Sequence, residues 1–365
     1  MASTVFFYSM DCRSQSHNKE QKVARLCKLL DLKNIVVPNQ PCAIKLHFGE
    51  EGNDTHINPA FARVVAEEVR KVGGKPFLTD TNTLYSGSRH NSVDHILTAI
   101  HHGFAPGVVD APVIIADGLF GNNEVMVEIN AKRFQKVRIA GDIAKAPSMV
   151  VLSHFKGHEM AGFGGAIKNL AMGCASPLGK QDQHGTHVTV DQEKCIGCGH
   201  CVKVCPQKAM SLNQDKKCVA DKEKCFGCFE CMTVCEQEAI QVDWATEIPA
   251  FMERLTEYGY GAIYGRQDHV AFINFVMNVT PDCDCVPWSD KPMIPDVGIL
   301  ASTDPVALDQ ACFDLVQKAP LLANIDKKDR DLFTARWNNT QCTIQLEYGE
   351  KLGMGSRKYE LKELS

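Results

Sequence analysis

Eight cysteines in two matched runs constrain this chain more than any other feature of its sequence. Both runs have the spacing C-x2-C-x2-C-x3-C, and they start thirty residues apart. The first run is Cys195, Cys198, Cys201 and Cys205, followed by Pro206, and the second is Cys225, Cys228, Cys231 and Cys235, followed by Glu236. Thiolates at this spacing ligate iron–sulfur clusters in bacterial two-cluster ferredoxins.

The spacing also predicts which cysteines share a cluster. Three thiolates with two residues between them wrap a tight loop around one 4Fe–4S cluster, and the fourth, on the following helix, reaches the other cluster. We therefore expect a first cluster on Cys195, Cys198, Cys201 and Cys235, and a second on Cys225, Cys228, Cys231 and Cys205. Gly197 and Gly227 let the backbone turn close to sulfur and offer it amide N–H groups. Zinc knuckles and disulfides are the alternatives, which two full repeats in register disfavour.

Composition excludes several other classes of protein. The seventeen cysteines lie in a chain of 365 residues whose first segment lacks the basic region of a signal peptide, so we expect a cytoplasmic, metal-binding protein. No stretch of about 18 apolar residues occurs, so no membrane partner is expected. The net charge is −5 without a long Lys/Arg run, which disfavours nucleic acid. A redox partner protein or a small-molecule substrate remains, and the oligomeric state is left open.

Strand-like and helix-like patterns alternate outside the cysteine runs, which is typical of an α/β domain. A helix is expected over Pro59–Val72, with Asn58 as its N-cap and Pro59 in its first turn. Further helices are expected at Asn169–Cys174, around Pro249–Tyr258 and from Pro305. Strands are expected near Ile44–Phe48, Pro76–Thr79, Val113–Ala116, Val137–Ala140, Met149–Ser153, Val270–Met277 and Val297–Ala301.

We therefore predict one α/β domain, a layered and mostly parallel sheet, with an inserted two-cluster ferredoxin domain. Residues 1–186 and 244–322 form the two parts of the α/β domain, and 187–243 form the insert. Residues 323–365 are a more polar C-terminal tail, which either wraps the surface or makes a subunit contact.

A second group of chemically capable residues lies just before the insert. His158, Lys168 and His184 are the candidate catalytic residues, because imidazole titrates near neutral pH and Lys168 can pair with an anion or anchor a cofactor covalently. A glycine loop that leads into a helix directs backbone N–H groups at one spot, which makes Gly162, Gly164 and Gly165 candidate cofactor-binding residues. The alternative is a glycine-rich crossover with surface histidines.

Other candidates follow strands, where α/β sheets bind ligands, and each could also be part of a plain loop. Lys45 and His47 are candidate cofactor-binding residues, and the same loop contains Gly49, Asn53 and His56. Asp80, Thr81 and Asn82 follow the next strand. Cys283 and Cys285 form a C-x-C pair that could bind metal or react as thiols. Six further cysteines are expected to be chemically inert: Cys12, Cys27, Cys42, Cys218, Cys312 and Cys342.

The chain resembles the iron–sulfur members of the domain-of-unknown-function 362 family over nearly its whole length. The resemblance is carried by KLHFGEEGNDTH, GGKPFLTDTNTLYSG, LSHFKGHEMAGFGGAIKNLAMGCAS, the paired cysteine motifs, NVTPDCDC and DVGILASTDPVALDQA. It implies an α/β core that carries a two-cluster ferredoxin module, without an established reaction.

A second, local resemblance concerns HEMAGFGGAIKNLAMG, which is similar to a segment of the nickel-pincer lactate racemases. It implies that His158 is an acid–base histidine and Lys168 the lysine that bears the cofactor. His184 would then fall near a nickel-ligating histidine. The racemases lack the cysteine insert, so what the resemblance implies is the position of an active site.

Three functions follow from these observations. The first is an oxidoreductase whose clusters pass electrons to a substrate or second cofactor near His158, Lys168 and His184, which implies a further metal or organic cofactor of unknown identity. The second is a ferredoxin-like electron-transfer protein without catalysis of its own. The third is a protein in which the clusters are structural or regulatory.

Overall fold

The computed structural model describes residues 2–12, 14–85, 87–185, 187–225, 227, 229–242, 244–322 and 324–364. For residues 242 and 244–247 it describes the backbone alone. Among the helices of this described part, none combines the length and the hydrophobicity that crossing a bilayer requires.

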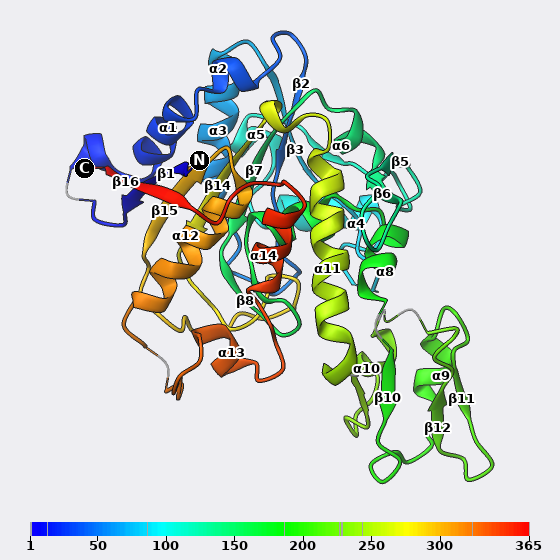
Figure 1. Ribbon diagram of the computed structural model, residues 1–365. Coiled ribbons are helices and arrows are strands. Elements are labelled where there is room, and N and C mark those ends of the chain that lie inside the picture. The colour runs from blue at the N-terminus through cyan, green and yellow to red at the C-terminus, as the bar shows by residue number, and fades with distance from the viewer. Residues whose placement is uncertain are drawn as a thin grey trace.

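An eight-stranded sheet forms the centre of the molecule (Figure 1). Its strand order is β16 (Tyr359–Leu364), β1 (Ser3–Ser9), β15 (Gly298–Ser302), β14 (Val270–Val276), β7 (Ser148–His154), β2 (Pro41–Lys45), β3 (Lys75–Asp80) and β4 (Val113–Ile115). All neighbouring pairs are parallel except the two that involve β15. Every residue of β7 and β14 is buried, as expected for central strands covered on both faces. The predicted α/β class with a mostly parallel sheet is confirmed.

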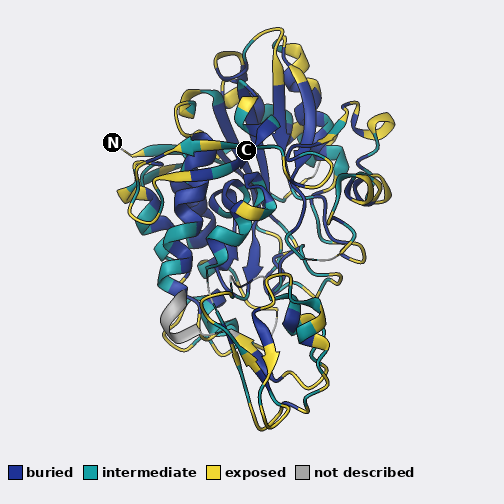
Figure 2. Cartoon of the chain, turned by 90° about the vertical axis from the view of Figure 1, so that its right-hand side faces the viewer, coloured by how far each residue is buried: buried dark blue, intermediate teal, exposed yellow. Residues whose placement is uncertain are grey.

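Helices cover both faces of the sheet, and a separate hydrophobic core lies under each layer. On one face pack α7 (Ala166–Cys174), α11 (Trp244–Ile263) and α12 (Pro305–Lys318), and on the other α1 (Lys19–Leu29) and α3 (Pro59–Lys71). The predicted helix at 59–72 is confirmed, because the side chain of Asn58 accepts the N–H of Ala60 and Pro59 begins the first turn. Figure 2 shows the buried residues concentrated in the sheet and the helices against it.

Shorter elements complete the α/β part. The helices are α2 (Leu32–Ile35), α4 (Ser92–His101), α5 (Pro106–Val109), α6 (Gly141–Lys145), α8 (Pro177–His184), α13 (Leu332–Arg336) and α14 (Ile344–Lys351), with 3-10 turns at Gln15–His17 and Gln267–His269. Two hairpins lie outside the main sheet: β5 (Glu124–Glu128) with β6 (Lys136–Ala140), and β8 (Lys156–His158) with β9 (Gly162–Gly164).

Two sequence expectations need correction. The strand expected at Val137–Ala140 exists as β6, but it pairs with β5 in a separate hairpin and not with the main sheet. The polar tail does more than cover the surface, because β16 pairs in parallel with β1 and forms one edge of the main sheet. Strands at the edge of a sheet contain few apolar residues. The sequence YELKEL of β16 therefore has the composition of a polar tail.

The described residues of 188–242, called the cysteine segment below, form a lobe beside α8 and α11 (Figure 1). It consists of β10 (Val188–Val190), α9 (His200–Val204), β11 (Met210–Leu212), β12 (Cys218–Ala220), α10 (Glu230–Thr233) and β13 (Ile240–Val242). Strand β10 pairs with β13, so the chain enters and leaves the lobe at neighbouring points. The lobe has a hydrophobic cluster of its own, which includes Val188, Met210 and Ile240.

Candidate functional site

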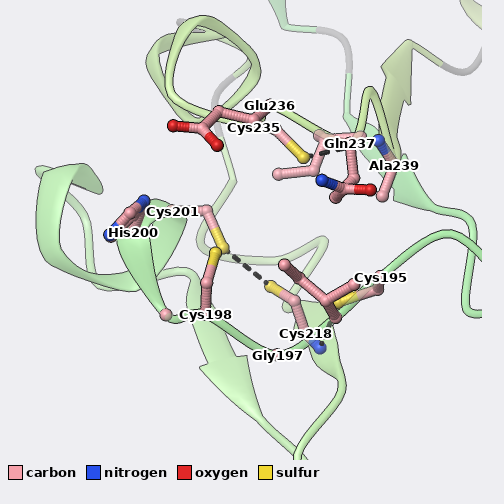
Figure 3. A pocket seen from close by; sticks show the side chains of 13 residues that line it. Cys195, Gly197, Cys198, His200, Cys201, Cys218, Cys235, Glu236, Gln237 and Ala239 are labelled. Carbon is pink, nitrogen blue, oxygen red and sulfur yellow. Dashed lines mark hydrogen bonds between the residues drawn. The ribbon is translucent and has the colours of Figure 1, made fainter.

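One pocket of the cysteine segment is lined by five cysteines (Figure 3): Cys195, Cys198, Cys201, Cys218 and Cys235. Four of them are the set that the spacing assigns to the first cluster. Cys235 comes from the second run and joins the three cysteines of the first, which is the exchange of the fourth ligand that the motif predicts. The donor set therefore fits a 4Fe–4S cluster.

A second pocket is lined by Cys205, Cys225 and Cys231, together with Gly227 and Phe229. Here Cys205 of the first run joins cysteines of the second, so the exchange is reciprocal. Cys228, the remaining predicted ligand, lies outside the described residues.

Backbone N–H groups reach the sulfurs at equivalent places in the two halves. The N–H of Ala209 lies 3.2 Å from Sγ of Cys205, and that of Ala239 lies 3.3 Å from Sγ of Cys235. Such bonds stabilise negative charge on sulfur and raise the reduction potential of a bound cluster. Gly197 has φ +74°, and a Cβ there would overlap the carbonyl of Lys216, so the turn beside the first pocket requires glycine.

Cys218 is a residue that sequence reasoning set aside as inert. Its Sγ lies 3.2 Å from Sγ of Cys201, and its N–H lies 3.3 Å from Sγ of Cys195. Cys218 is on β12, outside both C-x2-C runs, so its spacing carried no signal. Its position against the first pocket could be found only from the folded chain.

A buried polar centre lies at one edge of the main sheet. The strands β2, β3, β7 and β14 are parallel, so their carboxyl ends and the loops that follow meet there. The polar centre consists of Lys45, Asp80, His154, Lys156, His158, Lys168, Cys283, Asp284 and Cys285. This edge brings together candidates that are up to 240 residues apart in the sequence.

Lys45, predicted to bind a cofactor, is wholly engaged inside the protein. Its Nζ lies 2.9 Å from Oδ1 of Asp80 and donates to Oδ1 of Asn169 at 2.6 Å. Both members of the ion pair are buried, with side-chain exposures of 0% and 3%. Lys45 thus ties β2 to β3 and to α7, and the nearby cations hold the pKa of Asp80 well below its usual range against the effect of burial.

His47, the second of these candidates, faces a network around Arg89. Arg89 approaches Nε2 of His47 at 3.1 Å, donates to Oε2 of Glu50 at 3.1 Å and donates to the hydroxyl of Tyr85 at 2.7 Å. Burial and the charge of Arg89 hold the pKa of His47 well below its usual range. The hydroxyl of Tyr85 in turn donates to the carbonyl of Cys285 at 3.0 Å, which positions the C-x-C loop.

The loop after β2 contacts the C-x-C loop directly, because Oγ1 of Thr55 donates to Oδ1 of Asp284 at 3.3 Å and the N–H of Glu50 donates to the carbonyl of Asp284 at 2.9 Å. Asn53 donates to the carbonyl of Trp288 at 3.1 Å and to Oγ of Ser289 at 3.0 Å. His56 packs against His102, with ring centroids 4.5 Å apart. Asn53 therefore joins the loop after β2 to the segment that follows Cys285.

His154 and Asp284 form a second deeply buried ion pair of the centre. Nδ1 of His154 lies 2.9 Å from both carboxylate oxygens of Asp284, and Nε2 lies 2.8 Å from the carbonyl of Met277. Both ring nitrogens of His154 therefore face oxygen acceptors. Burial alone would raise the pKa of Asp284, but His154 and Lys156 hold it well below its usual range.

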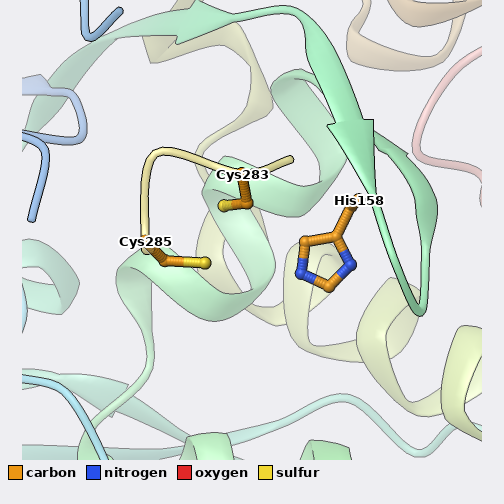
Figure 4. Close-up of side chains that lie close together, drawn as sticks. All are labelled: His158, Cys283 and Cys285. Atoms are coloured by element: carbon orange, nitrogen blue, oxygen red, sulfur yellow. The ribbon is translucent and has the colours of Figure 1, made fainter. Parts of the chain in front are cut away.

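His158, Cys283 and Cys285 converge beside this pair. Their donor atoms lie within 4.8 Å of one another, and Figure 4 shows the sulfur of Cys285 directed toward the imidazole ring. These distances fit a shared metal ion in principle. However, Nδ1 of His158 accepts the N–H groups of Met160 and Ala161 at 3.1 and 3.0 Å, so the ring proton stays on Nε2, the nitrogen on the cysteine side.

Lys168 and the glycine loop complete the centre. Nζ of Lys168 lies 3.5 Å from Sγ of Cys283. Gly165 precedes α7, and a Cβ there would overlap the carboxylate of Asp309. This carboxylate accepts the first N–H groups of the helix, those of Ala166 and Ile167, at 2.8 and 2.9 Å. The N-terminus of α7 is therefore capped from within the protein.

Gly162 and Gly164 are also packed by protein atoms. A Cβ at Gly162 would overlap the side chain of Cys342, and one at Gly164 would lie 3.2 Å from Cδ of Lys168. The loop predicted to bind a cofactor thus brings the β8–β9 hairpin close to α7 and to the C-terminal part of the chain.

His184 ends α8 and connects the polar centre with the cysteine segment. Its ring stacks on Phe251 at 5.6 Å and meets Phe229 edge-on at 5.3 Å. Burial and the positive charge of Lys168 lower the pKa of His184 to about 3. The charge of Lys168 also contributes to the lowered pKa of His158. The three predicted catalytic residues therefore share one electrostatic environment.

Comparison with known proteins identifies the family. The family model described as domain of unknown function (DUF362) matches residues 42–314. Ferredoxin-2 of Desulfomicrobium norvegicum is 53% identical over 32 residues, which are 9% of this chain and 54% of that protein.

Two solved structures are also similar to the chain. The lactate racemase apoprotein of Thermoanaerobacterium thermosaccharolyticum has 13% identity and a TM-score of 0.39, over 74% of this chain and 50% of that one. A protein of Thermotoga maritima has 10% identity and a TM-score of 0.36, over 79% and 57%. The chain thus spans little more than half the length of the proteins it matches. The family expected from the motifs is confirmed, and since its model covers well over half of the residues, this chain belongs to the DUF362 family.

Proposed function

We propose that the protein is an iron–sulfur oxidoreductase that holds two 4Fe–4S clusters in the cysteine segment and uses their electrons at the polar centre. The likeness to a ferredoxin and the number of cysteines support an iron–sulfur protein. The reciprocal exchange of Cys205 and Cys235 between the two pockets supports two clusters of the ferredoxin kind. When bound, such clusters supply single electrons.

The observation that carries this proposal is the position of Phe229. Its side chain lines the second pocket, and its ring lies edge-on to His184 at 5.3 Å. His184 in turn lies in the field of Lys168, which contacts Cys283. The second pocket is therefore the one adjacent to the polar centre.

The residues of the polar centre support binding of a polar or anionic substrate. His158 is held neutral with its proton on Nε2, because burial and the charges of Lys168 and Lys156 keep its pKa well below the usual range. A neutral imidazole of this kind donates a hydrogen bond to a substrate oxygen and does not act as a base. Lys168 supplies a positive charge beside it.

A ferredoxin-like carrier without its own catalysis is the second candidate. It is favoured by Ile196, which lies in the wall of the first pocket and is 66% exposed. An exposed apolar residue next to a cluster site suits docking of a redox partner protein. The same contact would serve the oxidoreductase as its entry point for electrons.

Anaerobically purified protein tests the proposal. About eight iron and eight sulfide per chain are expected, and zinc without sulfide would exclude it. The rate at which reduced protein is reoxidised by candidate substrates then separates the two functions. In the oxidoreductase, Lys168→Ala and His158→Ala slow this reoxidation while iron content stays constant. In the carrier, neither substitution changes the exchange of electrons with a partner.

A further inference from the structure

We propose that Cys283 and Cys285 form a redox-active dithiol that is oxidised reversibly to a disulfide by exchange with small-molecule disulfides. This activity goes beyond the proposed function, because it requires neither of the two clusters. It assigns a role to two cysteines outside the cysteine segment.

The C-x-C loop brings its two sulfurs close together. It is a turn, in which the N–H of Val286 donates to the carbonyl of Cys283 at 3.1 Å, and the two Sγ atoms lie within 4.8 Å of each other. Asp284, between the two cysteines, is held by His154 at 2.9 Å and Lys156 at 3.4 Å. The hydrogen bond from Tyr85 to the carbonyl of Cys285 fixes the end of the loop.

The surroundings of the pair stabilise one negative charge on sulfur. A hydrogen bond from Cys285 and the ammonium of Lys168, 3.5 Å from Sγ, hold the pKa of Cys283 well below its usual range despite burial. The hydrogen bond with Cys283 and burial raise the pKa of Cys285, so the two sulfurs share one proton. Buried cysteines elsewhere behave differently, since burial raises the pKa of Cys42 to about 12 and that of Cys174 to about 11.

The same geometry disfavours a metal ion between the three donors. A metal-binding imidazole normally donates its second N–H to an oxygen. In His158 the second nitrogen instead accepts two backbone N–H groups, so the nitrogen that faces the sulfurs carries the proton. The Cys283 thiolate therefore has the Nε2–H of His158 and the ammonium of Lys168 beside it. A hydrogen-bond donor and a positive charge stabilise a thiolate, which favours thiol chemistry over metal binding.

The exchange reaction balances with these groups. Cys285 is the more exposed sulfur, so it attacks the substrate disulfide RSSR while the Cys283 thiolate takes its proton. An S–S bond forms between Cys285 and one R–S group, and the other leaves with that proton as RSH. The Cys283 thiolate then attacks Cys285, the second R–S⁻ leaves, and the intramolecular disulfide is complete. The pair has lost two electrons and RSSR has gained them.

Thiol mapping tests this directly. Full-length protein, purified anaerobically, is incubated with oxidised glutathione, denatured in acid, treated with N-ethylmaleimide and analysed by mass spectrometry. We expect a disulfide between Cys283 and Cys285 that dithiothreitol reverses. In Cys283→Ser, glutathione stays attached to Cys285, because the resolving thiol is gone. Cys27→Ser, a buried cysteine on the other face of the sheet, serves as the matched control and behaves as wild type.

A second variant supports the test independently of the cysteine substitutions. Lys168→Gln removes the ammonium, so formation of the disulfide shifts to higher pH, whereas a purely structural lysine would leave this pH profile unchanged. The proposal is overturned if wild type forms no disulfide at any glutathione ratio. It is also overturned if a further metal protects both thiols and is lost in Cys285→Ser. Iron and sulfide are measured on the same samples. If the protein contains no clusters but still forms the disulfide, the proposed function is refuted and this inference stands.

Discussion

Asp284 in the C-x-C loop pairs with both His154 and Lys156. Replacing Asp284 by Asn removes the one negative charge in these two described pairs. Asp284 and His154 have side-chain exposures of 1% and 3%, so water cannot compensate. The ring of His154 would keep its contact to the carbonyl of Met277 but lose the carboxylate of Asp284. The substitution therefore leaves His154 and Lys156 without their shared anionic partner.

The expected cost follows from that geometry. Breaking a buried ion pair by removing one partner costs about 3–5 kcal/mol. With 365 residues, the entropy of unfolding is about 0.8 kcal/mol per degree, so the midpoint of thermal unfolding should fall by about 4–6 °C. Because the folded state depresses the pKa of Asp284, its contribution is present above about pH 4 and is lost as the pH falls further.

Calorimetry and chemical denaturation at several pH values would measure the effect. Asp326→Asn is a suitable control, since Asp326 pairs with Lys328 at 3.6 Å and both side chains are about three-quarters exposed. We expect no measurable change for the control and a gap between wild type and Asp284→Asn that narrows below about pH 4. A fall of less than about 1 °C at pH 7, or a gap that is independent of pH, would refute the reasoning.

Three further predictions concern other parts of the molecule. Cys195→Ser should lower iron and sulfide from about eight to about four per chain, and an unchanged iron content would contradict the ligand assignment. Gly197→Ala should destabilise the cysteine segment by about 1–3 kcal/mol, because φ is +74° and the new Cβ overlaps the carbonyl of Lys216. Loss of cluster absorbance at a lower denaturant concentration would show this destabilisation, and an unchanged midpoint would count against it. Lys45→Met should cost about 3 kcal/mol in denaturant unfolding by removing the cation nearest to buried Asp80, whereas a neutral result would mean that the pair contributes little.

Local patterns predicted much of the fold because their causes are local. The helix at 59–71 was readable from Asn58, Pro59 and the spacing of apolar residues. The strands β7 and β14 were readable from their unbroken apolar runs. The spacing of the runs likewise agrees with the presence of Cys235 in the first pocket and Cys205 in the second.

Partners that are distant in the sequence could not be read in this way. The pattern of β6 is that of a sheet strand, and nothing local distinguishes a hairpin with β5 from a place in the main sheet. The pair of His154 with Asp284 joins residues 130 apart, and both look like ordinary loop positions in the sequence. Cys218 has no spacing relation to either run, yet it lies against the first pocket.

The pairing of β1 has a consequence for the order in which this chain is assembled. Its two neighbours in the sheet are β15 and β16, which begin at residues 298 and 359. A ribosome delivers the N-terminal end first, so β1 stays unpaired until synthesis has passed residue 298. All eight motif cysteines have emerged before that moment. The proposed clusters can therefore be inserted while β1 still exposes unpaired edges, which are prone to aggregation.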